Sequence, residues 1–387
     1  NSNNPDVVIT TGFNPAHIEA WLWTRLKGKK HIGWTDGWLK SEEGLTFVHR
    51  TLRRMIYKGS EAYVGASKAS LKLFEFYGAS KERAFQSCEN LTDVTLSENL
   101  EIINEAVFRF CKKLKSINIP DNITSIGQDA FENCNVLESI NFNSSSKLSE
   151  IKSGAFQSCT SLQNFIIPNV SIVGDYAFRG CSTITEINLP NSITSLGKEV
   201  FSFCSSLIDI VNLPNQIDKI PEQMFEGCTA LETLVIPSHI KTIAQRAFDS
   251  CTKLSSVTIP NTVTSIEKQV FEENESLLSI ELPNSITIIE ERTFRKTGLQ
   301  NIVLSNSLTS IGKSAFAECV NLTSINFPSS LTSLGSLSFD RSALTSVTIP
   351  NTITDFDSLI FRGCENLTTV NLSNGLSSLG ESMFNSC

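Results

Sequence analysis

Residues 311–327 read IGKSAFAECVNLTSINF, and the pattern of this stretch decides the fold. Its phenylalanine, Phe316, has counterparts along most of the chain at intervals of 22 to 25 residues. Fourteen phenylalanines keep this register: Phe85, Phe108, Phe131, Phe156, Phe178, Phe201, Phe225, Phe248, Phe271, Phe294, Phe316, Phe339, Phe361 and Phe384. Such self-similarity at a fixed period indicates a repeat architecture.

A short strand follows each phenylalanine. Leu114–Ile119 has the form Leu-x-x-Ile-x-Ile, in which the last two apolar residues alternate with a polar one, as in a half-buried strand. One such unit cannot bury its own apolar face, so neighbouring units must stack. We therefore expect residues 85–387 to form a curved leucine-rich-repeat solenoid with a concave parallel sheet. It would contain about 14 Phe-anchored repeats, the last of them truncated.

The full repeat reads I-x-x-G-x-x-A-F-x-x-C-x-x-L-x-x-I-x-I-P and is clearest at Ile126–Ile140 and Ile311–Phe327. It resembles the BspA-like leucine-rich repeats. The resemblance covers residues 85–387 and implies an adhesin or interaction protein, on the surface of or secreted by a bacterium or a parasitic protist. The function expected from it is a non-catalytic adhesion or protein-interaction scaffold.

Each of the 11 cysteines lies three residues after a repeat phenylalanine, and Asn274, Thr297 and Ser342 occupy the same column in three other repeats. Small residues in one column favour a tight, partly buried slot filled by reduced thiols. Disulfides between adjacent repeats are a second interpretation, although the odd count leaves one cysteine over. A metal site is the third, although no C-x-x-C or Cys/His cluster is present. We expect no metal and no cofactor.

One column of each strand must point out of the concave sheet, because successive side chains alternate between faces. Its residues are small, polar and mildly acidic, and they form either a long surface that binds a protein or glycan or simply an exposed, soluble sheet. The column lacks the Trp, Tyr and Arg that usually anchor interfaces, and Ile166, Val235 and Val303 are its apolar exceptions. The candidate binding residues are Asn118, Asn141, Ile166, Asn188, Val235, Thr258, Glu281, Val303 and Asn326.

Residues 1–84 differ from the repeats. They carry 13 Lys and Arg against 8 Asp and Glu, whereas residues 85–387 carry 19 against 32. Strand patterns at Asp6–Thr10, His31–Trp34 and Ala62–Ala66 alternate with helix patterns at Asn14–Leu26, Leu45–Lys58 and Lys68–Tyr77. This alternation predicts a small, partial Rossmann-like βαβαβα segment with a parallel sheet. The fold class expected for the whole chain is therefore α/β.

Three motifs in this segment resemble the acceptor-side domain of GT-B glycosyltransferases: GFNPAH at 12–17, WTDGWLK at 34–40 and YVGAS at 63–67, followed by Tyr77-Gly78. The resemblance implies acceptor contacts in loops at the carboxyl ends of the strands, and the candidates are Asn14, His17, Asp36 and Lys40. The donor-binding domain of that family is missing, since the repeats begin where it should continue. We predict a non-catalytic remnant. The alternative is a glycosyltransferase fragment that transfers a sugar only if a donor-binding domain is supplied elsewhere.

The remaining signals concern partners and location. The net charge of −8 argues against a nucleic-acid partner. Arg50, Arg53, Arg54 and Lys58 lie near one face of the second expected helix, which suits either weak contact with an anionic membrane surface or a solvated face. No signal peptide or run of ~18 apolar residues is visible, so the resemblance alone favours a cell-surface or secreted protein. Sequons that a eukaryotic secretory route would glycosylate include Asn90, Asn122, Asn169, Asn321 and Asn366.

Overall fold

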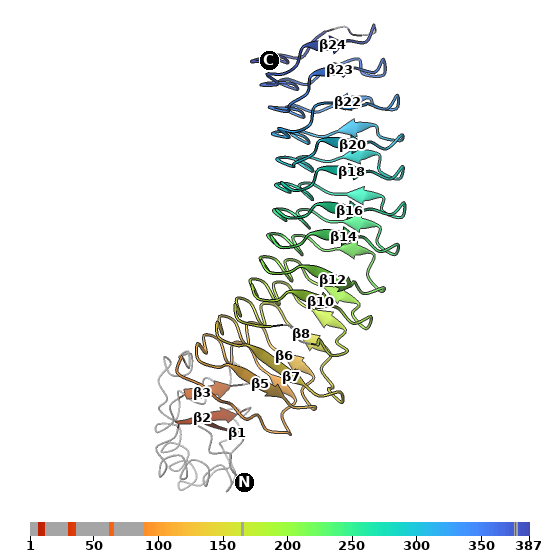
Figure 1. Cartoon of the computed structure of the whole chain (residues 1–387). Coiled ribbons are helices and arrows are strands. Elements are labelled where there is room, and N and C mark those ends of the chain that lie inside the picture. The colour runs from red at the N-terminus through yellow and green to blue at the C-terminus, as the bar shows by residue number, and fades with distance from the viewer. Residues whose placement is uncertain are drawn as a thin grey trace, which may run out of the picture. The chain divides into compact units, whose positions relative to one another are not determined.

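The computed structural model describes residues 7–11, 30–35, 62–65, 89–163, 166–374, 376 and 378–387 (Figure 1). The chain divides into two compact units, Asn1–Ile172 and Val173–Cys387. The described residues of each unit form short strands and turns.

The first unit begins with a small parallel sheet of β1 (Val7–Thr11), β2 (Lys30–Thr35) and β3 (Ala62–Gly65), in the order β1-β2-β3. The three strands predicted in this segment, and their parallel pairing, are confirmed. The helices expected at Asn14–Leu26, Leu45–Lys58 and Lys68–Tyr77 lie outside the described residues, and so does the predicted domain boundary at residue 84. The Rossmann-like fold of this segment therefore stays a prediction.

From residue 89 on, the described part of the first unit is a stack of coils, which add strands to two layers. In the first layer β5 (Ser116–Ile119) pairs in parallel with β7 (Ser139–Phe142). The side chains of β5 alternate between exposed and buried, as predicted for a half-buried strand. The second layer contains two-residue strands that also pair in parallel: β4 (Ile102–Ile103), β6 (Ser125–Ile126) and β8 (Glu150–Ile151).

The second unit repeats the same arrangement, with coils stacked one on the next (Figure 1). Its first layer contains β10 (Glu186–Asn188), β12 (Asp209–Asn212), β14 (Thr233–Val235), β16 (Ser256–Thr258), β18 (Ser279–Glu281), β20 (Asn301–Val303), β23 (Ser346–Thr348) and β24 (Thr369–Asn371). Its second layer contains β11 (Ser195–Leu196), β13 (Lys219–Ile220), β15 (Thr242–Ile243), β17 (Ser265–Ile266), β19 (Ile288–Ile289), β21 (Ser310–Ile311) and β22 (Ser333–Leu334). The strand β9 (Ile172–Val173) lies at the boundary of the two units.

Neighbouring coils of the second unit lie very close at their glycines. A Cβ atom on Gly197 would lie 2.3 Å from the backbone nitrogen of Asp175, one coil earlier. Any side chain at residue 197 would therefore push these two coils apart. The glycine of the repeat consensus is explained by this close backbone approach.

No helix occurs among the described residues, so the predicted α/β class is wrong for the repeats, which form a parallel β-solenoid. The segment around each repeat phenylalanine from Phe108 on is not helical, because the residues two positions before and after it adopt positive φ. Gln269 (φ 61°) and Glu273 (φ 59°) flank Phe271 in this way. The Phe271 N–H donates to the carbonyl of Thr293 in the next coil, 3.0 Å away, and not to a residue of its own turn.

The repeat phenylalanines form a file through the core of each unit. Phe108, Phe131 and Phe156 stack at centroid distances of 5.1 Å in the first unit. Ten rings from Phe178 to Phe384 stack in the second at 5.3 to 6.1 Å, with neighbouring rings no more than 15° from parallel. The rings are buried as far as Phe361. The prediction that these residues form the core is confirmed for both units.

The cysteines form a second buried file, and every described cysteine is a free thiol. The thiols donate hydrogen bonds to the carbonyl oxygen of the phenylalanine one repeat earlier. Examples are the bonds from the Cys134 Sγ to Phe108 (2.9 Å) and from the Cys251 Sγ to Phe225 (3.3 Å). Burial raises the pKa of the Cys204 thiol to about 12 and that of Cys319 to about 11. For the described cysteines the reduced interpretation is therefore confirmed and the disulfide interpretation is wrong, and all of them except Cys387 are packed in the core.

We expect the native protein to react slowly with Ellman's reagent. Nine of the ten described cysteines are buried, and only Cys387 among them is exposed. The reagent reacts with thiolates and not with thiols, and burial keeps these groups protonated and out of its reach. At most two thiols, those of Cys387 and Cys88, should react before denaturation, and all 11 should react in urea. Three or more fast thiols in the folded protein would contradict a buried file.

Asn274 occupies a cysteine position in this file and lowers the stability of the fold. Its side chain is fully buried, and neither its Oδ1 nor its Nδ2 has a hydrogen-bond partner. We expect Asn274→Cys to raise the free energy of unfolding by about 1–3 kcal/mol in urea denaturation, because it removes two unsatisfied polar atoms. Thr297→Cys is the matched control, because the Thr297 hydroxyl already donates to the carbonyl of Phe294 (2.8 Å). Equal gains in the two variants would show that the unpaired amide is not the cause.

Candidate binding surface

The strand face is the solvent-exposed side of the first strand layer. All nine residues predicted to point outward are exposed, as expected where successive side chains alternate between the two faces of a strand. The first unit presents Asn118, Asn141 and Ile166 on this face. The second unit presents Asn188, Val235, Thr258, Glu281, Val303 and Asn326. Periodicity alone therefore placed these side chains in solvent, while their role in binding is a separate question.

The polar residues of the strand face satisfy one another in part. In the first unit the Asn141 Nδ2 donates to the Oδ1 of Asn118 (2.8 Å). In the second unit the Asn371 Nδ2 donates to the Oγ1 of Thr348 (3.1 Å). Bonds of this kind keep an exposed sheet ordered and soluble without any partner. They do not explain why aliphatic side chains occupy other positions of the same column.

Aliphatic side chains are strongly exposed on the strand face. Val235 is 72% exposed and Val303 is 58% exposed in the second unit, and Ile166 is 88% exposed in the first. Two further residues at the start of strands in the second unit, Ile208 and Leu278, are about half exposed. Covering a side chain of this size is worth ~1.5–3 kcal/mol, so these are the groups on the face with most to gain from contact.

Val211 belongs to the same set and is not identified by the regular spacing. The pairing of β10 with β12 shifts between Ile187 and Asn188, so that Asn188 faces Asn212 and Val211 is extra. Such a β-bulge adds one residue to one strand and leaves Val211 half exposed. The signal in the sequence is the 24-residue interval from Phe201 to Phe225.

The strand face of the second unit carries acidic charge alone. No Lys, Arg or His occurs at its strand positions, by which we mean the first-layer strands, the residues that flank them and the equivalent residues of the other coil. These are residues 185–189, 208–212, 232–235, 255–258, 278–281, 300–303, 323–326, 345–348 and 368–371. Four exposed carboxylates lie among them: Glu186, Asp209, Glu232 and Glu281. In the described part of the chain, no ion pair involves Asp209, Glu232 or Glu281. Asp209, Glu232 and Glu281 therefore place negative charge beside the exposed aliphatic groups of this face.

Some acidic residues elsewhere in the second unit have cationic partners. On the second strand layer Lys219 Nζ lies 2.9 Å from Glu267, and Lys241 Nζ lies 3.2 Å from Asp218. At the turns Lys296 Nζ lies 2.9 Å from Glu273. Cations therefore lie beside some acids of the second layer and of the turns, whereas the strand positions of the first layer contain none.

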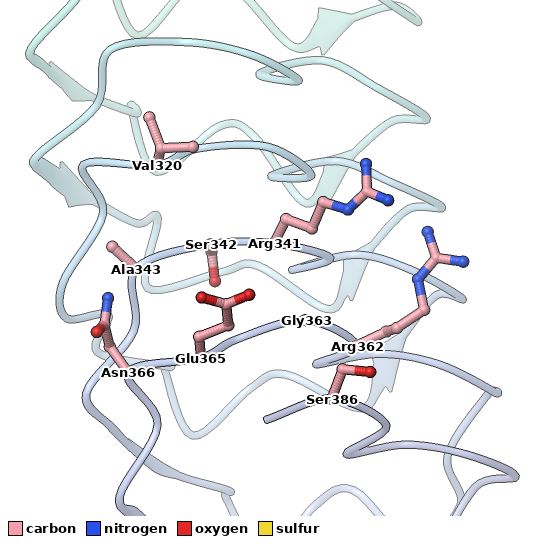
Figure 2. Close-up of a pocket in the computed structure, with 9 residues that line it drawn as sticks. All are labelled: Val320, Arg341, Ser342, Ala343, Arg362, Gly363, Glu365, Asn366 and Ser386. Atoms are coloured by element: carbon pink, nitrogen blue, oxygen red, sulfur yellow. The ribbon is translucent and has the colours of Figure 1, made fainter.

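A pocket of about 510 Å³ lies at the turns of the last coils of the second unit (Figure 2). The repeat that begins at Phe339 lacks one residue between Ser342 and Leu344, and the shorter turn leaves a gap beside Ala343. The guanidinium group of Arg362 is held by two 2.7 Å hydrogen bonds to Asp340. Figure 2 shows the Arg341 and Arg362 guanidinium groups extending away from Glu365. The polar groups of this pocket do not converge on one point, so it is a weaker candidate than the strand face.

The other predicted site residues lie outside the described residues. They are the acceptor-side candidates Asn14, His17, Asp36 and Lys40 and the membrane-contact candidates Arg50, Arg53, Arg54 and Lys58. Their roles stay predictions. Among the described residues no group of three or more His, Cys, Asp or Glu side chains is arranged to hold a metal ion, and no helix is able to cross a membrane.

Comparisons with known proteins agree with the geometry of the repeats. The family model of the BspA type leucine rich repeat region matches residues 80–208, 202–307 and 287–387. The chain is similar to the crystal structure of a leucine-rich repeat protein from Bacteroides ovatus, with 28% identity over 76% of this chain and 82% of that one and a TM-score of 0.64.

A second similar structure is that of a leucine rich cell surface protein from Faecalibacterium prausnitzii, with 28% identity over 73% of this chain and 86% of that one and a TM-score of 0.52. No curated protein matches the chain. The family model covers the whole described solenoid, with its stacked phenylalanines and its file of buried thiols. The chain therefore belongs to the family of BspA type leucine rich repeat proteins.

Proposed function

We propose that this protein is a non-catalytic binding scaffold that holds a protein or glycan partner on the strand face of its repeats. The observation that supports this function best is the exposure of Val235 and Val303 in a column that other repeats fill with polar residues. Aliphatic side chains add nothing to the solubility of an exposed sheet. Contact with a partner would bury these side chains and so contribute to binding.

The repeat architecture suits this function because it presents similar groups at a fixed interval. Neighbouring strands lie ~4.8 Å apart, so a partner that crosses several coils meets the same kind of contact several times. Contacts that are weak one by one then add up along the stack. The proposal includes no glycosyl transfer, since that alternative depends on the resemblance of residues 1–84 alone.

A location outside the cell is part of the proposal. The similar protein from Faecalibacterium prausnitzii is described as a cell surface protein. The buried thiols are compatible with an oxidising exterior, because each donates to a backbone carbonyl inside the core, as Cys251 does to Phe225. A membrane-impermeant biotin reagent applied to intact producing cells should label the protein, and protection of the protein until the cells are lysed would contradict this location.

Photo-crosslinking tests the binding surface. With p-benzoyl-phenylalanine at Thr258, in the middle of the strand face of the second unit, we expect a crosslinked adduct of defined mass in the protein's native setting. The same group at Glu365, an exposed turn residue off this face, should give none. The adduct at Thr258 should disappear when the chain also carries Val235→Arg. Adducts that form equally at both sites, or that survive Val235→Arg, would contradict the strand face as the binding surface.

A further inference from the structure

We infer that the partner of the second unit is an extended polypeptide segment that carries Lys or Arg side chains alternating with aliphatic ones. This inference rests on the proposed function, because it names the chemistry of the partner for the same surface. It is carried by the charges of the strand face, by its exposed aliphatic groups and by their spacing.

The charge of the surface selects a cationic partner. Glu186, Asp209, Glu232 and Glu281 supply the only charged side chains at the strand positions of the second unit, as defined above. Glu186 and Asp209 face each other directly across β10 and β12, where like charges destabilise a sheet. A partner that places a cation beside Asp209 relieves that repulsion. An acidic partner would be repelled, and complementary charge also steers the encounter.

The aliphatic groups select a polypeptide over a glycan or a polyamine. Val211, Val235 and Val303 are each at least half exposed, and they lie among the carboxylates of the strand face. A ligand that offers charge alone would leave them in water. A polypeptide strand offers charged and apolar side chains on one face, because every second residue points the same way.

The spacing of the groups gives the partner's pattern. Asp209 and Glu281 lie three coils apart, which is ~14 Å along the stack at the spacing of paired strands, and they are offset by two residues along the strand direction. A peptide that runs across the coils covers this span in about four residues at ~3.3 Å per residue. Cations four residues apart therefore match the two carboxylates, and an aliphatic residue midway between them lies over the Val235 region.

The test uses a peptide built to this pattern, Lys-Ser-Val-Ser-Lys-Ser-Val-Ser-Lys, labelled with fluorescein and titrated with the full chain. Fluorescence anisotropy should show saturable binding that weakens about tenfold or more from about 50 mM to about 500 mM NaCl. Peptides in which Gln or Glu replaces every Lys should bind at least about tenfold more weakly.

Variants of the chain locate the binding. The triple variant Asp209→Asn, Glu232→Gln and Glu281→Gln should raise the Kd by about tenfold, and Val235→Ser with Val303→Ser by about threefold or more. The matched control Glu275→Gln, Glu365→Gln and Glu381→Gln removes three exposed carboxylates away from the strand face. It changes the net charge equally and should alter the Kd less than about twofold.

The outcomes separate this inference from the proposed function. If the Gln peptide binds as tightly as the Lys peptide, and only the valine variant weakens it, the cationic partner is wrong and the strand face stands. If the control triple weakens binding as much as the strand-face triple, the attraction is one of net charge and the inference fails. If the Lys peptide does not bind at all, the inference also fails, and crosslinking at Thr258 then decides the proposed function independently.

Discussion

Phe248→Ala lowers the free energy of unfolding by about 3–5 kcal/mol, the range found for truncation of a buried aromatic residue. The Phe248 ring is fully buried between Phe225 and Phe271, with ring centroids 5.5 and 6.1 Å away. Neither neighbour is free to fill the cavity, because adjacent coils are joined by backbone bonds such as the one from Phe248 N–H to the Val270 carbonyl. Urea denaturation followed by circular dichroism measures the loss.

The control for this prediction is Phe203→Ala in the same unit. Phe203 is 45% exposed and lies under the guanidinium group of Arg179, 5.2 Å from the ring centroid. Its removal should cost about 1 kcal/mol or less, since an exposed cation–π contact is worth about that. Comparable losses for Phe203 and Phe248 would contradict a core built on the phenylalanine file.

Asp249→Asn raises the stability of the protein above neutral pH by about 2–4 kcal/mol. Asp249 is 7% exposed, and burial raises the pKa of its carboxyl group to about 7. Glu226 and Glu272, which occupy the same column one repeat earlier and later, raise this pKa further, whereas the Ser250 hydroxyl and Arg246 lower it. The Arg246 contact is loose, with 3.8 Å from its Nε to the carboxylate.

The sign of the pH dependence follows from the raised pKa. Between its ordinary value of 3.8 and about 7, Asp249 binds a proton in the folded state and not in the unfolded state. Its contribution to stability therefore falls as the pH rises through this range and is fully lost above about pH 7. In Asp249→Asn this fall should be absent, which urea midpoints measured from pH 5 to pH 8 will show.

Asp218→Asn is the control for the pH series. Asp218 is paired with Lys241 on the surface, and both side chains are 66% exposed. Exposed pairs of this kind contribute about 0–1 kcal/mol. A wild-type protein whose stability does not fall between pH 5 and pH 8 would contradict the buried, acid-flanked environment of Asp249.

The core was predictable from the sequence because every repeat must place equivalent residues in equivalent surroundings. The interval between phenylalanines locates Phe248 and Cys251 without coordinates, and alternation within the strands locates the exposed column of Val235 and Val303. Glu226, Asp249 and Glu272 also form a column in the sequence. What the period does not show is that Asp249 and Glu272 are buried, which makes Asp249 sensitive to pH.

Some backbone conformations, the shortest strands and the ion pairs could not be predicted from the repeat period, for physical reasons. The left-handed conformations of Gln269 and Glu273 arise from bonds between coils, and nothing in either side chain signals them. The two-residue strands of the second layer are too short to show a period. The pairing of Lys219 with Glu267 joins residues 48 positions apart, so sequence alone did not show which acids have a cation beside them.

Pulsed electron–electron spin resonance between labels on the strand face of the second unit tests the stacking of the coils most directly. Labels at Thr233 paired with Ser346 or Thr369 span five or six coils, so we predict distances of ~24 and ~29 Å, with ~19 Å from Ser256 to Ser346. Each further coil should add ~5 Å. Distances that do not grow with the number of coils would contradict a regular stack, and with it the ordered strand face on which the proposed function depends.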